Sequence, residues 1–100
     1  MKMYILIKEF VPNNFAPVIA AHASLACYLK YSDDPEMQTW ISGVFKKCVC
    51  KVNEKEFENA KSVERNLLLT ESALDNQEVA LVFSPRIEYP KMFQFFKLWK

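Results

Sequence analysis

The chain has 100 residues, of which 51% are hydrophobic and 25% are charged, and its formal net charge is +1 at pH 7. This length predicts a single domain over residues 1–100, and the composition excludes a disordered chain. The near-zero net charge excludes recognition by bulk charge, so a nucleic-acid partner would need a local basic patch.

The first predicted elements are a strand over residues 3–9 and a helix that starts near residue 15 and runs to about Tyr31. Residues 3–7 (MYILI) are apolar on both faces of the strand, which is typical of an interior strand covered on both sides. Residues 15–29 carry no charged side chain and are rich in alanine. A helix with such small side chains can lie very close to a sheet, so we expect Ala20 and Ala23 at the contact.

Two further helices and a strand are predicted in the middle of the chain. The segment Asp33–Glu36 (DDPE) combines a capping acid with proline at the first helical position, and Gly43 ends this short helix. Phe45–Val52 is predicted to be a strand. The segment Asn53–Glu56 resembles a capping box, which indicates the start of a third helix.

The last part of the chain predicts a hairpin followed by a helix. Two apolar runs, 67–70 and 79–83, are separated by the turn formers of 72–77, which indicates neighbouring strands. Pro85 stops the second strand, and Pro90 starts a final helix rich in Phe and Trp. This helix is apolar over more than half of its circumference, so it is either covered on two sides or meets another chain.

The predicted order of elements is β-α-α-β-α-β-β-α. Helices on both faces of a four-stranded sheet give a three-layer α/β/α domain. The exposed apolar surface that remains favours a homodimer through the C-terminal aromatic helix or a sheet face.

The low numbers of glycine and cysteine also limit the classes of function that the chain can have. Gly43 is the one glycine, which excludes phosphate-binding P-loops and dinucleotide fingerprints, because both need several glycines. An odd count of three cysteines favours free thiols in a reducing compartment. We expect a cytoplasmic protein with no membrane contact, because the 15–29 segment is shorter than the roughly 20 residues needed to span a bilayer.

Four segments of the chain occur in an order that matches a known family. They are KMYILIK (2–8), IAAHASLA (19–26), Trp40 followed by KKCVCKV (46–52), and ALVFSP (80–85) followed by FKL (96–98). This succession resembles the peptidyl-tRNA hydrolase 2 family over nearly the whole chain. The resemblance implies a mixed four-stranded sheet ordered 2-1-4-3 with an antiparallel fourth strand, usually in a dimer. It also implies cleavage of the ester between a peptide and its tRNA, with no metal or cofactor.

The family places a functional lysine in a Gly/Lys-rich segment before its first helix. When the Ile-Ala-Ala segments are aligned, Val18 stands at that lysine and His22 stands at a family glutamine. When the histidines are aligned instead, Phe15 and Ile19 take these two positions. The lysine is lost in both registers.

The family also has a D-A-G-x-T loop after its third strand, and Thr70–Ala73 (TESA) is the nearest counterpart here. The two departures favour a relative with a degenerate active site that acts as a binding module for RNA, a small molecule or a protein. The alternative is a working hydrolase with a rearranged site. In that site His22 would be the general base, Glu71 would orient it, and Ser72 would lie near the leaving group. The other interpretation of His22 is a core histidine that is satisfied by a backbone carbonyl.

Basic side chains concentrate in the middle of the chain. Lys46, Lys47 and Lys51 are candidates for contact with tRNA phosphates, which would add salt-dependent affinity. The simpler interpretation is a solvated edge strand, because lysines also protect sheet edges from unwanted pairing.

Two remaining groups are interpreted as structural. Cys48 and Cys50 share one face of a strand, and zinc needs thiolates that converge on one point, so we predict packing cysteines and no metal. Trp40 and the aromatic residues near the end of the chain are able to stack on bases. Aromatic residues at helical spacing are more often core or oligomer contacts, and the set near the end consists of Tyr89, Phe93, Phe95, Phe96 and Trp99.

Overall fold

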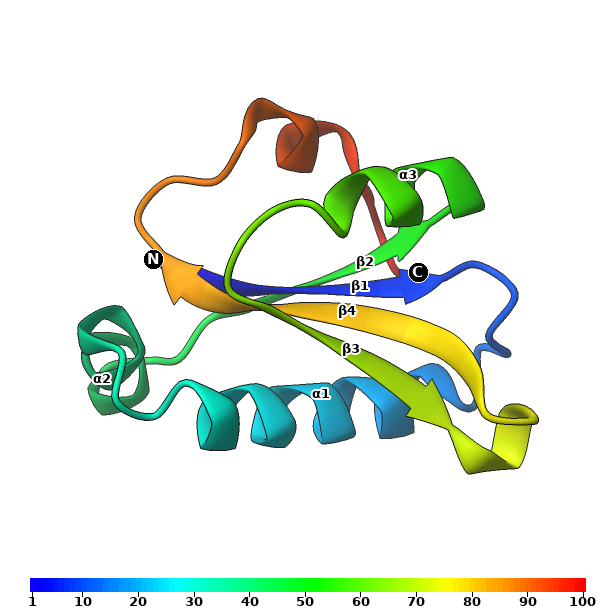
Figure 1. Ribbon diagram of the computed structural model, residues 1–100, viewed down its shortest axis with the longest axis horizontal. Helices are drawn as coiled ribbons and strands as arrows, with labels where there is room; N and C mark the ends of the chain where they lie inside the picture. Colours follow the sequence, from blue (N-terminus) through cyan, green and yellow to red (C-terminus); the bar gives the residue numbers. More distant parts are fainter.

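The computed structural model describes residues 1–100 as a five-stranded mixed sheet with helices on both faces (Figure 1). In chain order the elements are β1 (Lys2–Lys8), α1 (Ala16–Lys30), α2 (Pro35–Ser42), β2 (Lys47–Val52), α3 (Glu54–Ala60), β3 (Asn66–Glu71), the short 3₁₀ helix η1 (Ser72–Leu74), β4 (Gln77–Arg86), a second 3₁₀ helix η2 (Lys91–Phe95) and β5 (Lys97–Leu98). No helix is both long enough and apolar enough to cross a bilayer.

The strands lie in the order β3-β4-β1-β2-β5. β1 pairs parallel with β2, and β4 pairs antiparallel with both β1 and β3. The first four strands therefore follow the order 2-1-4-3, which is the order that the resemblance implied. A shared strand order describes the architecture alone. The expected count of four strands is wrong, because β5 adds a fifth strand at the edge of β2.

The predicted helix after Pro90 is also wrong. Five residues form η2, and the chain then extends into β5, where the Trp99 backbone N–H donates to the Val49 carbonyl at 2.9 Å. Phe93 is buried among aromatic rings on the sheet, at 5.0 Å from both Tyr4 and Phe83 between ring centroids. The unpaired edge of β2 offers backbone hydrogen bonds that a helix would leave unused, so the tail pairs with the sheet instead.

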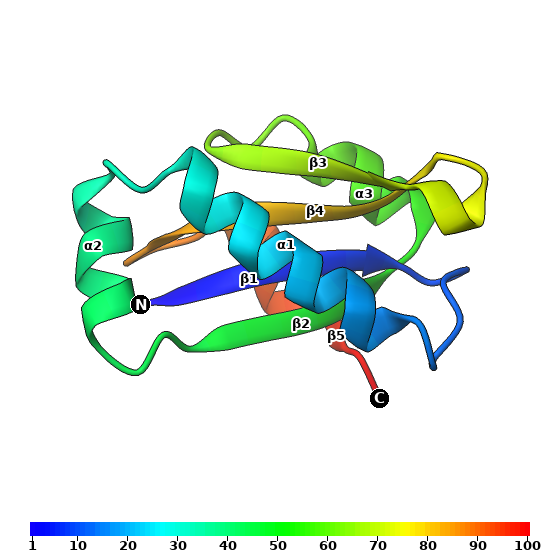
Figure 2. The ribbon, with the colours of Figure 1, turned by 90° about the horizontal axis from the view of Figure 1, so that it is seen from below.

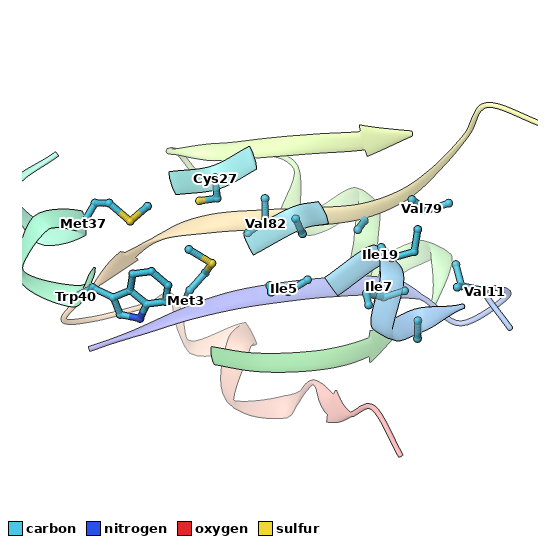
Figure 3. Packing of buried hydrophobic residues seen from close by; sticks show 13 residues of the cluster. Met3, Ile5, Ile7, Val11, Ile19, Cys27, Met37, Trp40, Val79 and Val82 are labelled. Carbon is cyan, nitrogen blue, oxygen red and sulfur yellow. The ribbon is translucent and has the colours of Figure 1, made fainter. Parts of the chain in front are cut away.

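The first helix lies across β1 and β4, as expected from its small side chains (Figure 2). Ala23 is completely buried and Ala20 is half-buried. The inward residues of α1 pack on the β1 side chains Met3, Ile5 and Ile7, and this core continues to α2 at one end of the sheet (Figure 3). The close approach of α1 therefore follows from the size of its inward residues.

The opposite face of the sheet is covered by α3 and η2 (Figure 1). Phe57 and Ala60 are the buried residues of α3, and they pack with Leu6 and Phe83 of the central strands. Both faces of the central strands β1 and β4 are thus buried, which explains why their sequences are apolar at successive positions.

The capping box that opens α3 is confirmed. The Asn53 side chain accepts from the Glu56 backbone N–H at 2.8 Å, and the Glu56 carboxylate accepts from the Asn53 backbone N–H at 2.9 Å.

We expect Asn53→Ala to lower the free energy of unfolding by about 1 kcal/mol, because it removes one of these bonds. Urea denaturation would measure the change. Asn59→Ala on the same helix is the matched control, since the Asn59 side chain is exposed and forms no hydrogen bond. An equal loss in both variants would contradict the capping argument.

Candidate functional site

The histidine proposed as a general base lies on the outer face of α1. His22 is exposed, because the inward stripe of the helix follows Ile19, Ala23 and Cys27. The interpretation of His22 as a core histidine is therefore wrong. The alanines on either side of His22 allow the helix to lie close to the sheet. They do not determine which side of the helix faces the sheet.

The other two members of the rearranged site lie at the end of β3. Glu71 is half-buried, and its carboxylate accepts from the Ala73 backbone N–H at 3.2 Å, which caps η1. Ser72 is exposed. No hydrogen bond or ion pair joins either residue to His22, and none of the surface hollows of the molecule is lined by any of the three. The structure thus gives these side chains no common site.

The predicted lysines fall on one edge of the sheet together with lysines from the tail. This basic edge consists of Lys46, Lys47 and Lys51 before and along β2, and of Lys97 and Lys100 in and after β5. None of the five forms an ion pair. The segments 44–52 and 89–100 contain no Asp or Glu. The positive charge of the edge is therefore uncompensated by side chains of its own strands.

Lys51 and Lys97 stand directly opposite each other in the β2–β5 pair. Like charges in this position repel and destabilise a sheet. With Leu98 and Lys100 they line a surface hollow of about 530 Å³. The Lys51 ammonium also lies 4.4 Å from the Trp99 ring centroid. A phosphate bound between the lysines would remove the repulsion, and an adjacent aromatic ring can stack on a base.

The other two lysines of the basic edge continue it toward α2. Lys46 and Lys47 are both exposed. The Lys47 ammonium lies 4.7 Å from the Phe45 ring centroid and donates to the Phe45 carbonyl at 3.0 Å. Phe45 is half-exposed beside it, so the edge alternates cations with aromatic surface.

The paired cysteines lie on the face opposite Cys27. The sulfur atoms of Cys48 and Cys50 are 3.8 Å apart, and burial raises the pKa of the Cys50 thiol to about 12. No group of three or more Cys, His, Asp or Glu side chains converges on one point. A buried thiol that stays protonated at neutral pH is a poor nucleophile, so Cys50 acts as a packing residue.

A polar network at the α2 end of the sheet was missed by sequence reasoning. Arg65, which precedes β3, donates to Asp34 at 3.0 Å and to Glu36 at 2.7 Å. The buried Ser84 hydroxyl of β4 also donates to Asp34 at 3.0 Å. Ser84 and Arg86 follow the apolar run 79–83 of β4. Polar residues at the end of a buried strand were the signal in the sequence for this network.

The network lowers the pKa values of both acids. Burial alone would raise the pKa of Asp34, but hydrogen bonds from Ser84, the Glu36 backbone N–H and Arg65 together hold it below its usual value. The pKa of Glu36 is lowered mainly by its hydrogen bond from Arg65. Both carboxylates therefore stay ionised to a lower pH than ordinary Asp and Glu side chains.

A scan of protein-family models and a search of curated proteins each found no match to this sequence. Of the surfaces predicted from sequence, the basic edge is the one in which the predicted residues lie together.

Proposed function

We propose that this chain is a peptidyl-tRNA hydrolase 2-like binding module, which binds RNA such as tRNA along its basic edge and does not hydrolyse it efficiently. The basic edge is the observation that carries the proposal. Five lysines lie along two paired strands without a carboxylate partner, and aromatic rings lie beside two of them. Single-stranded nucleic acids are bound by this combination of phosphate contacts and stacking surfaces.

The β2-β1-β4-β3 strand order and the order of the sequence segments support the family resemblance. The loss of the family lysine and of the glycine-rich segments supports binding over catalysis. The alternative hydrolase with a rearranged site has less support, because His22, Glu71 and Ser72 share no contact. Nucleophilic or general-base chemistry needs these groups within hydrogen-bond reach of one substrate.

RNA binding is tested by fluorescence anisotropy with a labelled single-stranded RNA and with labelled tRNA at two salt concentrations. If three lysines contact phosphates, the logarithm of the affinity falls with the logarithm of salt concentration with a slope of about −2. Lys97→Ala is expected to weaken binding and to make this slope shallower. Undetectable or salt-independent binding would contradict the proposal.

The matched control is Lys55→Ala, because Lys55 is an exposed lysine of α3 that forms no ion pair. It removes the same charge from another part of the surface and is expected to leave the slope unchanged. An equal effect of the two variants would show binding by net charge and would count against a defined edge.

Hydrolysis is tested by incubating labelled peptidyl-tRNA with the protein and with the variants His22→Ala and Glu71→Ala. We expect no turnover above the spontaneous rate in any of the three. Turnover in the unmodified protein that either substitution abolishes would establish the rearranged hydrolase and overturn the binding-only proposal.

A further inference from the structure

Residues of two connections line a surface hollow of about 470 Å³. Both connections lie at the same end of the sheet (Figure 1). One connection runs from α3 to β3 and contains Arg65, and the other runs from β4 to η2 and contains Tyr89. The volume is within the range of small-molecule sites. None of the five lysines of the basic edge lines this hollow, so it is separate from the proposed RNA surface.

The charge of Arg86 is buried beside the hollow without a counterion. The residue is only 5% exposed, and it forms no ion pair. Its guanidinium donates to two backbone carbonyls, those of Ser84 at 3.1 Å and Arg65 at 3.2 Å, and it lies 4.9 Å from the Tyr89 ring centroid. Its Nη1 atom contacts no acceptor in the protein, and this atom reaches the surface, because no fully buried side-chain nitrogen is without a partner. A buried charge normally has a partner of opposite sign, so this one is open to a carboxylate.

Arg65 adds a second guanidinium to the lining. Its backbone has a φ of 59°, in the left-handed region that an arginine rarely adopts. This conformation is held because its carbonyl accepts both the Ser84 backbone N–H at 3.0 Å and the Arg86 guanidinium. Only Nη1 of Arg65 contacts Asp34 and Glu36, which leaves its Nε and Nη2 donors unused. Strained backbone of this kind is frequent at binding sites.

The rest of the lining carries the opposite charge. Glu64 and Glu88 line the hollow and are exposed, and neither forms an ion pair. A simple anion would be repelled by these two carboxylates. A simple cation would leave the Arg86 charge without a partner, because Arg65 is already paired with Asp34 and Glu36. A ligand that carries both charges pairs with Arg86 and with a carboxylate of the lining.

We propose that the hollow between Arg86 and Glu88 binds a small zwitterion of the α-amino acid class. The ligand carboxylate contacts the free donors of Arg86 and Arg65, and its ammonium group contacts Glu88. The ring of Tyr89 and the side chain of Val63 offer apolar contacts to the ligand side chain. This inference is independent of RNA binding.

The test uses three probes that share one apolar side chain: L-leucine, L-leucinamide and N-acetyl-L-leucine. The amide lacks the carboxylate, and the acetylated form lacks the ammonium group. Titrations followed by amide chemical shifts are expected to show saturable binding of L-leucine at the backbone of residues 63–65 and 86–89. Each derivative should bind at least about tenfold more weakly, which corresponds to about 1.4 kcal/mol. Absence of saturable shifts with leucine, or equal binding of the three probes, would overturn the proposal.

A variant series separates binding from folding. Glu88→Gln alters an exposed side chain, so the fold is expected to persist while leucine affinity falls and the affinity for N-acetyl-L-leucine rises. Glu9→Gln is the matched control, because Glu9 is exposed and lies outside the hollow. If Glu88→Gln leaves the leucine affinity unchanged, the ammonium contact is wrong and the zwitterion proposal fails. Failure here would leave the RNA-binding proposal unaffected, since that proposal rests on other residues.

Discussion

Phe83→Ala is expected to lower the free energy of unfolding by about 3–5 kcal/mol. Phe83 is completely buried in the central strand β4, and its ring lies at 5.0 Å from Phe93 and 6.5 Å from Tyr89 between centroids, in edge-to-face geometry. Alanine would leave a cavity in the face that α3 and η2 cover. The neighbouring strands cannot close this space without breaking their pairing. Chemical denaturation followed by circular dichroism measures the loss.

Phe95→Ala is the matched control for this prediction. It removes the same ring, but Phe95 is 70% exposed on η2. We expect a change within about 0.5 kcal/mol, because exposed substitutions rarely cost more. If both variants lost stability equally, the tail would be packed differently from the structure described here.

Asp34→Ala is expected to lower the free energy of unfolding by about 2–4 kcal/mol, because one side chain has three structural roles. Asp34 caps α2 by accepting the Glu36 backbone N–H, it accepts the Ser84 hydroxyl, and it pairs with Arg65. Alanine removes the cap and leaves the buried Ser84 hydroxyl without its acceptor. The neighbouring Asp33→Ala is the control, since Asp33 is exposed and forms no hydrogen bond or ion pair. A smaller loss for Asp34 than for Asp33 would contradict the assignment of the cap.

The contribution of Asp34 also depends on pH. Its pKa is lower in the folded protein than in the unfolded chain, so the folded state is stabilised by the ionised carboxylate. This stabilisation is complete above the unfolded pKa of about 3.9 and is lost as the pH falls through the lowered folded value. The difference in stability between the unmodified protein and Asp34→Asn should therefore shrink below about pH 4. Denaturation curves at pH 7 and at acid pH measure this difference.

Much of the architecture was predictable because its signals are local. The strand at residues 2–8, the alanine-rich helix, the cap of α3 and the hairpin of β3 and β4 each follow from periodicity or from a capping residue within a few positions. Asp34 caps α2 directly before Pro35, as the capping acid and the proline at the first helical position predicted. These elements fix the sheet, and the sheet brings the lysines of the basic edge together.

The features that sequence reasoning missed depend on contacts between distant segments. The fifth strand forms because β2 has an open edge, which the apolar tail sequence does not reveal. The outward direction of His22 depends on which alanines touch the sheet. The Arg65 network joins α2, the start of β3 and the end of β4, and no spacing along the chain brings these residues together.

The pairing of β1 with β4 has a consequence for how the chain folds. These two strands form the middle of the sheet, yet they come from the beginning and near the end of the sequence. Closing so long a loop costs chain entropy before any long-range contact forms, so topologies of this kind assemble slowly. During synthesis, residues 2–8 must wait without their antiparallel partner until residues 77–86 have left the ribosome. A nascent chain interrupted before residue 77 would expose the apolar strand MYILI to solvent and to other chains.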